Sequence, residues 1–321
     1  MPDHTPRNWF AVPAPVAALF RRFPLVVYPA NDLPVRSPSR GDLPTLYVFV
    51  ADDDAPKGRP SFNPSCLKWQ VRRRPLPLSL SLSLSLSLPS CTTFFKIAGV
   101  EVRILPSTNH ASPSGALPYL LPPSPLRPVA GASKLESYAL ENSPLPREKR
   151  PPSSAPSDRL QAYQSLLDTR LRTAWLHALY LAPDNAPLLA RLYIHPASNN
   201  PLVRLTLTHQ VRSAAEAEVL KSTRAAAVDP KRVYADARAA FEALAALLDE
   251  NGSGGDGWFF GCEGPTLFDA SVFAYTHLLL DEEFGWADRA LPEILAGFPG
   301  LVRHRERLLE RCFPDDEGVL V

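Results

Sequence analysis

The chain has 321 residues, of which 34 are lysine or arginine and 33 are aspartate or glutamate, for a formal net charge of +1. This balance gives no electrostatic reason to expect nucleic acid or an anionic membrane surface as the main partner. Hydrophobic residues make up 45% of the chain, which is enough for a sizeable core. The length allows two domains at roughly 100 to 200 residues each.

The cysteines and histidines form no motif. The four cysteines are widely spaced and contain no CxxC pair: Cys66, Cys91, Cys262 and Cys312. We therefore expect a reducing compartment, with neither a zinc site nor a disulfide framework. The dispersed histidines likewise predict no metal, and nothing in the sequence calls for a cofactor. The first twenty residues resemble no signal peptide. Residues 267–280 are apolar but interrupted by polar side chains, so any membrane contact should be peripheral.

The chain begins with a proline-rich segment, residues 1–43, which we interpret as an N-terminal extension. Residues 45–50, TLYVFV, predict a buried strand because β-branched and aromatic residues dominate them. The sequence FNPSCLKWQ that follows predicts the start of a helix. Asn63 is a good N-cap residue, and Pro64 suits the first helical position.

Leucine and serine then alternate without a break over residues 78–88. Strict alternation is typical of a half-buried strand, but a perfect repeat fixes no register, and low-complexity segments are often unpacked. Removing residues 71–92 places four apolar side chains at steps of three, three and four, on one face of a single helix: Cys66, Trp69, Phe94 and Ala98. A CT dinucleotide repeat in DNA encodes alternating leucine and serine. We hypothesise that residues 71–92 are an insert from a retained intron.

Beyond the insert the pattern returns to short elements. Gly99 predicts the end of the helix, and residues 100–105 predict a second strand, which completes a βαβ unit. Pro118 introduces a short strand, where a cis peptide is compatible with the pattern. A short helix is predicted to begin near Ser133. Residues 142–156, crowded with Pro, Ser, Lys and Arg, predict an interdomain linker.

The second half is predicted to be all helical over residues 157–314, with a tail at residues 315–321. Apolar residues recur three or four apart in residues 160–181 and again in residues 231–250. In the sequence PTLFDAS, Thr266 is placed to cap a helix. Asp269 lies three residues further on and can reach back in a capping box.

Two features have both a functional and a structural interpretation. Cys66 lies near a helix start, where a thiol pKa is lowered, but it has no second cysteine or nearby histidine, and we favour a buried structural thiol. Glu136 and Ser137 could bind the amine and carboxylate of a peptide-like ligand, although we favour a solvated first helical turn. No catalytic residue is predicted. The candidate structural or binding residues are Cys66, Trp69, Pro118, Glu136, Ser137, Thr266 and Asp269.

The order of these elements resembles the glutathione-transferase-like fold, an α/β plus all-α architecture. The resemblance implies a thioredoxin-like domain over residues 44–141, interrupted by the insert, and then the helical domain. More narrowly, five segments resemble the metaxin family: LPTLYVFV, PSFNPSCLKWQ, TFFKIAG, NHASPSGALPYLL and WFFGCEGPTLFDASVFAYTHLL. The opening segment WFAVPAPVAALFRRFPLVVYP is similar to peripheral subunits of the mitochondrial sorting and assembly machinery.

The resemblance implies a protein that is not an enzyme and that lies on the cytosolic face of the mitochondrial outer membrane. Its implied partners are a membrane-embedded β-barrel assembly subunit, a second metaxin-like subunit and β-barrel precursors. Strand addition to an edge of the N-terminal sheet, near residues 45–50 or 100–105, is one way to hold a precursor.

Two alternatives remain open. The first is a glutathione-dependent transferase, because Pro118 and the Glu136–Ser137 pair resemble the glutathione-site proline and acidic-Ser pair. Against it, proline and serine crowd residues 122–128, and no Tyr or Ser occupies an obvious thiol-activating place after the first strand. The second alternative is a glutathione-transferase-like scaffold in another soluble complex.

Overall fold

The computed structural model describes residues 43–51, 54–55, 59–70, 94–123, 127–146, 157–250 and 257–312. The chain divides into two units, residues 1–40 and 41–321, and every described residue belongs to the second. Nearly all of the predicted extension, the predicted insert and the predicted tail lie outside the described residues. We call the described residues before 147 the sheet part and those from 157 onward the helical part.

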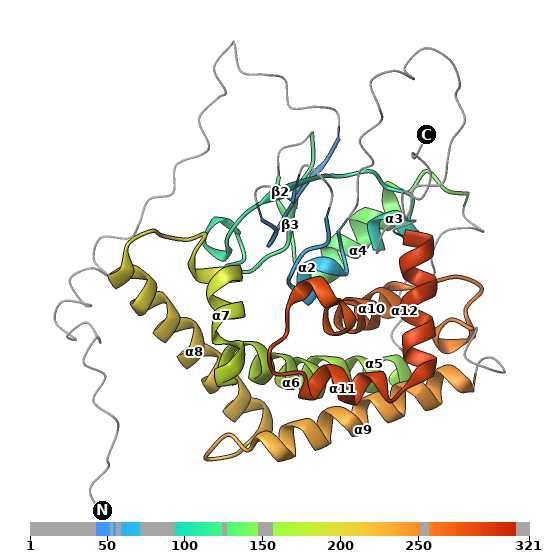
Figure 1. Ribbon diagram of the computed structural model, residues 1–321. Coiled ribbons are helices and arrows are strands. Elements are labelled where there is room, and N and C mark those ends of the chain that lie inside the picture. The colour runs from blue at the N-terminus through green and yellow to red at the C-terminus, as the bar shows by residue number, and fades with distance from the viewer. Residues whose placement is uncertain are drawn as a thin grey trace, which may run out of the picture. The chain divides into compact units, whose positions relative to one another are not determined.

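Four short strands form the sheet of the sheet part (Figure 1). They are β1 (Thr45–Val48), β2 (Arg103–Pro106), β3 (Tyr119–Leu121) and β4 (Val129–Ala130), in the spatial order β2-β1-β3-β4. Strand β1 is central: it pairs parallel with β2 and antiparallel with β3. The second strand begins three residues later than predicted, and β4, which pairs antiparallel with β3, was not predicted at all.

Two helical turns flank the insert, α2 (Pro64–Leu67) and α3 (Phe94–Ile97). The Phe94 N–H donates to the Lys68 carbonyl at 3.0 Å. With residues 71–92 left out of the count, Phe94 follows Lys68 by four positions, so this is the hydrogen bond of a continuous α-helix. Trp69 packs against Phe94 and Phe95, with ring centroids 5.5 and 5.9 Å apart. The side chains predicted to share one face, among them Cys66 and Ala98, are all buried.

The helix after the insert ends as the sequence predicts. Gly99 has φ +73, a left-handed conformation that costs glycine little. The peptide bond between Leu117 and Pro118 is cis, at the entry to β3. Helix α4 (Ala132–Glu141) then packs through Leu135 and Ala139 into the core beside the sheet.

The helical part opens with one continuous helical run made of α5 (Asp158–Leu166), η3 (Leu167–Leu171), α6 (Arg172–Leu176) and η4 (His177–Leu181). Next come η5 (Pro183–Asn185), α7 (Ala186–Leu189), η6 (Ala190–Ile194), α8 (Pro201–Thr223) and α9 (Pro230–Asp249). The last elements are η7 (Phe259–Gly261), α10 (Leu267–Leu280), η8 (Glu282–Phe284), α11 (Ala290–Ala296) and α12 (Pro299–Cys312). The two helices predicted from periodicity in this part are confirmed as the opening run and α9.

Helix α10 lies inside the helical part, where it packs against η3, α11 and α12 (Figure 1). Residues 268–279 are all buried, as expected for a helix that is apolar on every side. Helix α10 also joins the two parts. Its Ala270 belongs to the core of the sheet part, and it packs against α2, whose Leu67 belongs to the core of the helical part. No helix within the described residues is long and apolar enough to span a bilayer.

Candidate functional site at the junction of sheet and helices

The first turn of α2 is held by Asn63, as the sequence predicts. Its Oδ1 accepts a hydrogen bond from the Ser65 N–H at 3.0 Å, which caps the helix. Its Nδ2 donates to the Tyr193 hydroxyl of η6, also at 3.0 Å. The cap therefore also ties the sheet part to the helical part, and both polar atoms of this amide are hydrogen-bonded.

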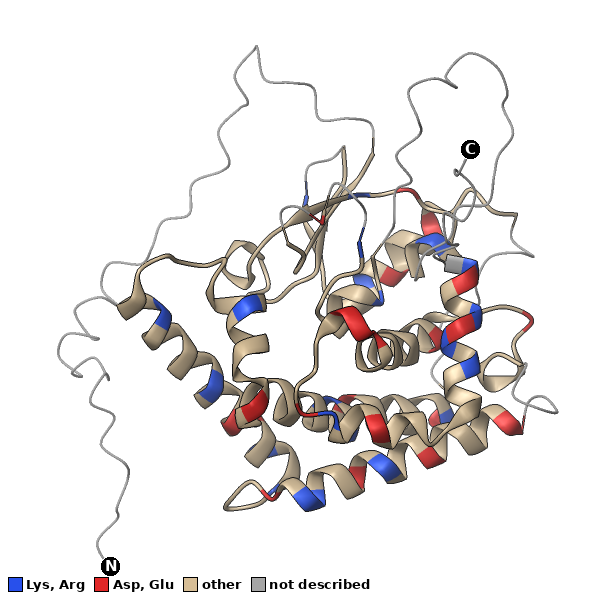
Figure 2. Cartoon of the chain, in the orientation of Figure 1, with Lys and Arg blue, Asp and Glu red and all other residues tan. Residues whose placement is uncertain are grey.

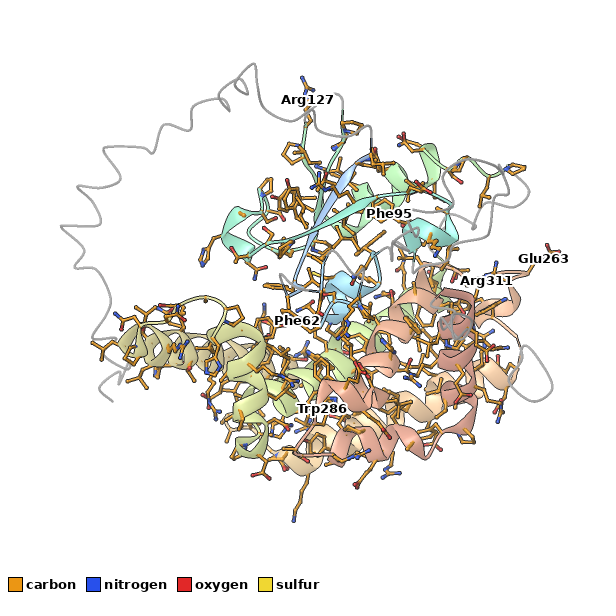
Figure 3. The ribbon with its side chains drawn as sticks, turned by 45° about the horizontal axis from the view of Figure 1, so that its top comes forward. Phe62, Phe95, Arg127, Glu263, Trp286 and Arg311 are labelled. Carbon is orange, nitrogen blue, oxygen red and sulfur yellow. The ribbon has the colours of Figure 1, made fainter. Side chains whose placement is uncertain are left out.

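Aromatic rings fill the space around this cap. Phe62, half-buried between the sheet part and the helices (Figure 3), meets Tyr193 edge-on with ring centroids 5.1 Å apart. Tyr193 also packs against Phe49 at 5.4 Å and Tyr180 at 5.6 Å. Burial raises the pKa of Tyr193 well above its ordinary value, so its hydroxyl stays neutral. These four rings, which we call the aromatic plug, pack together at the junction of the sheet part and the helical part.

The nucleophile-type side chains near α2 have structural roles. Cys66 is fully buried, and burial raises the pKa of its thiol to about 12. The favourable effect of a helix start on a thiolate is therefore outweighed by desolvation. Ser61 is also fully buried, and its hydroxyl donates to the Phe49 carbonyl. These observations agree with the interpretation of Cys66 as a packed structural residue.

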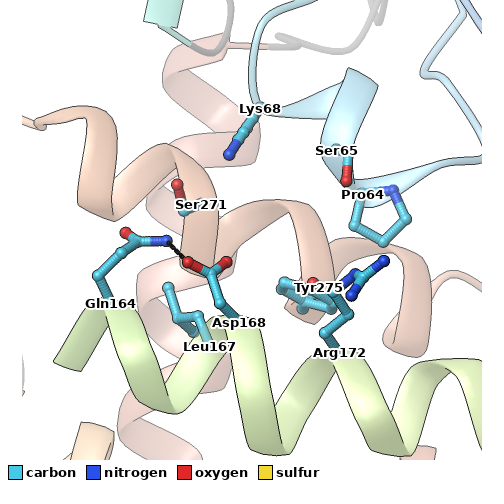
Figure 4. Close-up of a pocket in the computed structure, with 9 residues that line it drawn as sticks. All are labelled: Pro64, Ser65, Lys68, Gln164, Leu167, Asp168, Arg172, Ser271 and Tyr275. Atoms are coloured by element: carbon cyan, nitrogen blue, oxygen red, sulfur yellow. Dashed lines mark hydrogen bonds between the residues drawn. The ribbon is translucent and has the colours of Figure 1, made fainter. Parts of the chain in front are cut away.

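A small polar cavity of about 100 Å³ lies where α2 meets the helical part (Figure 4). Sequence reasoning missed it, because its lining comes from segments far apart in the chain: Pro64, Ser65, Lys68, Gln164, Leu167, Asp168, Arg172, Ser271 and Tyr275. Ligand pockets usually span roughly 300 to 1,000 Å³, so this cavity suits a few water molecules rather than a peptide-sized ligand.

The charges around the cavity compensate one another. Burial lowers the pKa of Lys68, and the nearby negative charge of Asp168 opposes this shift. Asp168 also accepts a hydrogen bond from Gln164 Nε2 at 3.1 Å. Arg172 is paired with Glu218 of α8 at 2.7 Å. Because Arg172 is paired and the charge of Asp168 lies near Lys68, the cavity is close to electrostatically balanced, and we assign it a structural role.

The candidate pair Glu136 and Ser137 does not lie at a helix start. Helix α4 begins after Gly131, which makes no side-chain cap, so Glu136 and Ser137 lie in its second turn. The backbone N–H groups there are used within the helix, whereas a ligand carboxylate would need the free donors of the first turn. The expected position in the first turn is therefore wrong, because both residues lie in the second turn. Ser137 is exposed to solvent.

Thr266 and Asp269 form the predicted capping box of α10. The Thr266 N–H donates to Asp269 Oδ2 at 2.9 Å, and the Asp269 N–H donates to Thr266 Oγ1 at 3.4 Å. Asp269 is fully buried, and its Oδ1 accepts from the Phe259 N–H at 3.1 Å. The same oxygen lies 3.0 Å from Nε2 of His304, which is also fully buried. The carboxylate thus joins α10, η7 and α12.

Sequence reasoning did not connect His304 with this cap. The signal was present in the spacing of α12, because Leu301, His304 and Leu308 follow one another by three and four residues and are all fully buried. A histidine on an apolar helix face requires a buried hydrogen-bond partner.

Within the described ranges no three His, Cys, Asp or Glu side chains gather in a group that could hold a metal ion.

Comparison with known proteins identifies the fold. The N-terminal domain family of glutathione S-transferases matches residues 89–185, and the C-terminal domain family matches residues 237–308. The first match starts beyond β1 and α2, which the insert separates from α3. A solved glutathione S-transferase of Ceriporiopsis subvermispora, in complex with glutathione, is similar at 14% identity and a TM-score of 0.43, covering 81% of this chain and 97% of the other. The comparison with curated proteins finds no relative.

The class of protein follows from these findings. The chain has a glutathione-transferase-like fold, with a thioredoxin-like N-terminal domain and a helical C-terminal domain. The predicted fold class is confirmed. The predicted domain boundaries stay predictions, as does the narrower resemblance to metaxins.

Proposed function

We propose that this protein is a non-enzymatic peripheral subunit of the mitochondrial outer-membrane sorting and assembly machinery, similar to the fungal 35-kilodalton subunit. It helps to recognise β-barrel precursors and to insert them into the outer membrane from the cytosolic face. Its partners are the membrane-embedded barrel subunit and a second metaxin-like subunit. The five sequence segments that resemble metaxins support this proposal, since they occur in the same order along the chain.

The single structural observation that supports a non-enzymatic role is the aromatic plug. A transferase of this fold needs an open site beside the first helix, with a group that activates a thiol. Here Asn63 is engaged by Ser65 and Tyr193, and Phe62 and Phe49 pack beside it. The Cys66 thiol is buried with a raised pKa.

The sheet limits how a precursor strand could be held. Strand β1 is paired on both sides, so strand addition at residues 45–48 is ruled out. Strand β2 pairs on one side only among the described strands. The Arg103 and Ser107 N–H groups donate toward β1, so Ile104 points its N–H to the other side. Photocrosslinkers placed at Ile104 should capture a precursor, whereas the same label at Leu46 should not.

Affinity purification of the full chain from mitochondria tests the proposed function. Recovery of the barrel subunit and a second metaxin-like subunit is the expected result. A chain that fractionates entirely with cytosol and recovers a different set of proteins would favour the scaffold alternative.

A glutathione-dependent transferase is the second candidate, because both matching domain families are those of glutathione S-transferases. Binding to immobilised glutathione, with turnover of a generic electrophile, would establish it. The informative variant is Asn63→Ser, which keeps a capping side chain and places a hydroxyl at the start of α2. We expect no turnover from the unmodified chain.

A further inference from the structure

Helix α8 begins with an exposed apolar tip, which we define as residues 196–205 and call the α8 tip. Within the described residues, the large hydrophobic side chains that stand exposed are Leu202 at 72%, Val203 at 40% and Leu205 at 68%. All three therefore lie within one turn of one helix. Exposed leucines scattered singly are ordinary, whereas a cluster marks a contact surface.

The tip projects from the helical part. No α8 side chain from residue 201 to residue 214 is buried, and the first buried residue is Ala215. Figure 1 shows this half of α8 extending away from α5 and α9, and Figure 3 shows the same from a second direction. The described core therefore gives the first turns of α8 little support.

The tip is nevertheless well formed. Asn200 caps the helix, since its Oδ1 accepts from the Leu202 N–H at 2.9 Å. Arg204 folds back over the preceding turn and donates from Nε to the Ser198 carbonyl at 2.6 Å and from Nη2 to Asn199 Oδ1 at 3.2 Å. These bonds hold the apolar side chains in an ordered turn.

The charge around the tip is of one sign. Residues 185–215 contain no aspartate or glutamate, but they contain Arg191, Arg204 and Arg212. Figure 2 shows blue without red along this half of α8. The net charge of +1 for the whole chain thus hides a local excess of positive charge along residues 185–215. Arg212 lies about 15 Å along the helix from Leu202, and its Nη2 donates to the Leu181 carbonyl at 3.2 Å, so Arg204 is the cation that lies within the tip.

We propose that the α8 tip docks on an anionic lipid bilayer, with Leu202, Val203 and Leu205 entering the interface and Arg204 of the same turn contacting headgroup phosphates. Exposed apolar side chains backed by cations are typical of interfacial membrane binding. A stable protein interface buries at least about 1,000 Å², which three side chains on a convex tip do not supply, whereas a bilayer surface needs no matching shape. The proposal rests on the membrane location in the proposed function but not on its protein partners.

Flotation of the full chain with lipid vesicles tests the proposal. The vesicles contain phosphatidylcholine either alone or with an added anionic phospholipid. The tip variant is the double substitution Leu202→Ser and Leu205→Ser, and the matched control is Ala214→Ser with Ala217→Ser, on exposed positions of the same helix. We expect the tip variant to bind anionic vesicles about tenfold less than the control, and added salt to weaken the binding of both.

The proposal is overturned if the unmodified chain binds neither vesicle, or if the tip variant binds vesicles as well as its control. If the tip variant binds vesicles as well as its control but loses the barrel subunit in purification, the tip is a protein contact. The proposed function has a separate test. It is contradicted if purification of the unmodified chain recovers no barrel subunit, whether or not the chain binds vesicles.

Discussion

Helices α10 and α8 belong to the same helical part but are used in opposite ways. Residues 268–279 of α10 are buried without exception, whereas only Ala215 and Val219 are buried in the 23 residues of α8. Apolar side chains on every face leave α10 no stable position other than the core. In α8 the leucines of the first turn lie outside that core. The comparison shows that similar side chains stabilise the fold in one helix and stay exposed in the other.

The largest expected effect comes from removing the carboxylate that begins α10. Asp269→Ala should lower the free energy of unfolding by about 3 to 5 kcal/mol, because His304 and the Phe259 N–H would lose their buried partner. Urea denaturation monitored by circular dichroism measures this loss. A cost under about 1 kcal/mol would show that the buried network contributes little.

Equivalent truncations in the two helices test the comparison directly. Leu279→Ala, in the core at the end of α10, should cost about 2 to 5 kcal/mol. Leu205→Ala, at an exposed position of α8, should change stability by no more than about 0.5 kcal/mol. Parallel urea curves give both values. Equal costs would mean that the α8 tip is covered in the folded protein.

Helix α10 also supports the interrupted helix of the sheet part, since Ala270 belongs to the sheet core. Deleting residues 71–92 should join α2 to α3 as one helix and raise the free energy of unfolding by about 1 to 3 kcal/mol, because a long loop no longer has to be closed. Thermal unfolding of the two chains is the measurement. A deletion variant that fails to fold would contradict the insert hypothesis.

Transcript sequencing tests the same hypothesis at its origin. We expect mature messenger RNA that joins the codons of Gln70 and Thr93. Uniform presence of the Leu-Ser repeat in mature transcripts would contradict a retained intron, whatever the stability of the deletion variant.

The smallest effect is expected from the capping hydroxyl alone. Thr266→Ala should cost about 0.5 to 2 kcal/mol, less than Asp269→Ala, because the carboxylate and its other partners remain. Thr266→Ser, which keeps the hydroxyl, is the matched control and should lie closer to the unmodified chain. The inference about the cap would be wrong if alanine and serine behaved alike.

Much of the fold was predictable from local patterns. Asn63 and Pro64 marked the start of α2, Gly99 marked the end of α3, and apolar spacing across residues 71–92 indicated one helix on both sides of the insert. These signals depend on residues a few positions apart, so they can be read without knowing the fold. The two-residue strand β4 could not be predicted, since it is defined by its pairing with β3.

The sequence by itself determined the helix caps, the helical periodicity and the order of elements that resembles a glutathione transferase. Only the tertiary structure decided which of the candidate residues are accessible. In the structure Cys66 is buried, and Glu136 and Ser137 lie beyond the first turn of α4. Asn63 is hydrogen-bonded to Tyr193, and Asp269 to His304. Leu202 and Leu205 are exposed. The physical reason is the separation of the interacting residues along the chain. A helix cap or a periodic helix face forms between residues that are near neighbours in the sequence. A buried hydrogen bond or an exposed apolar turn depends on how distant segments pack.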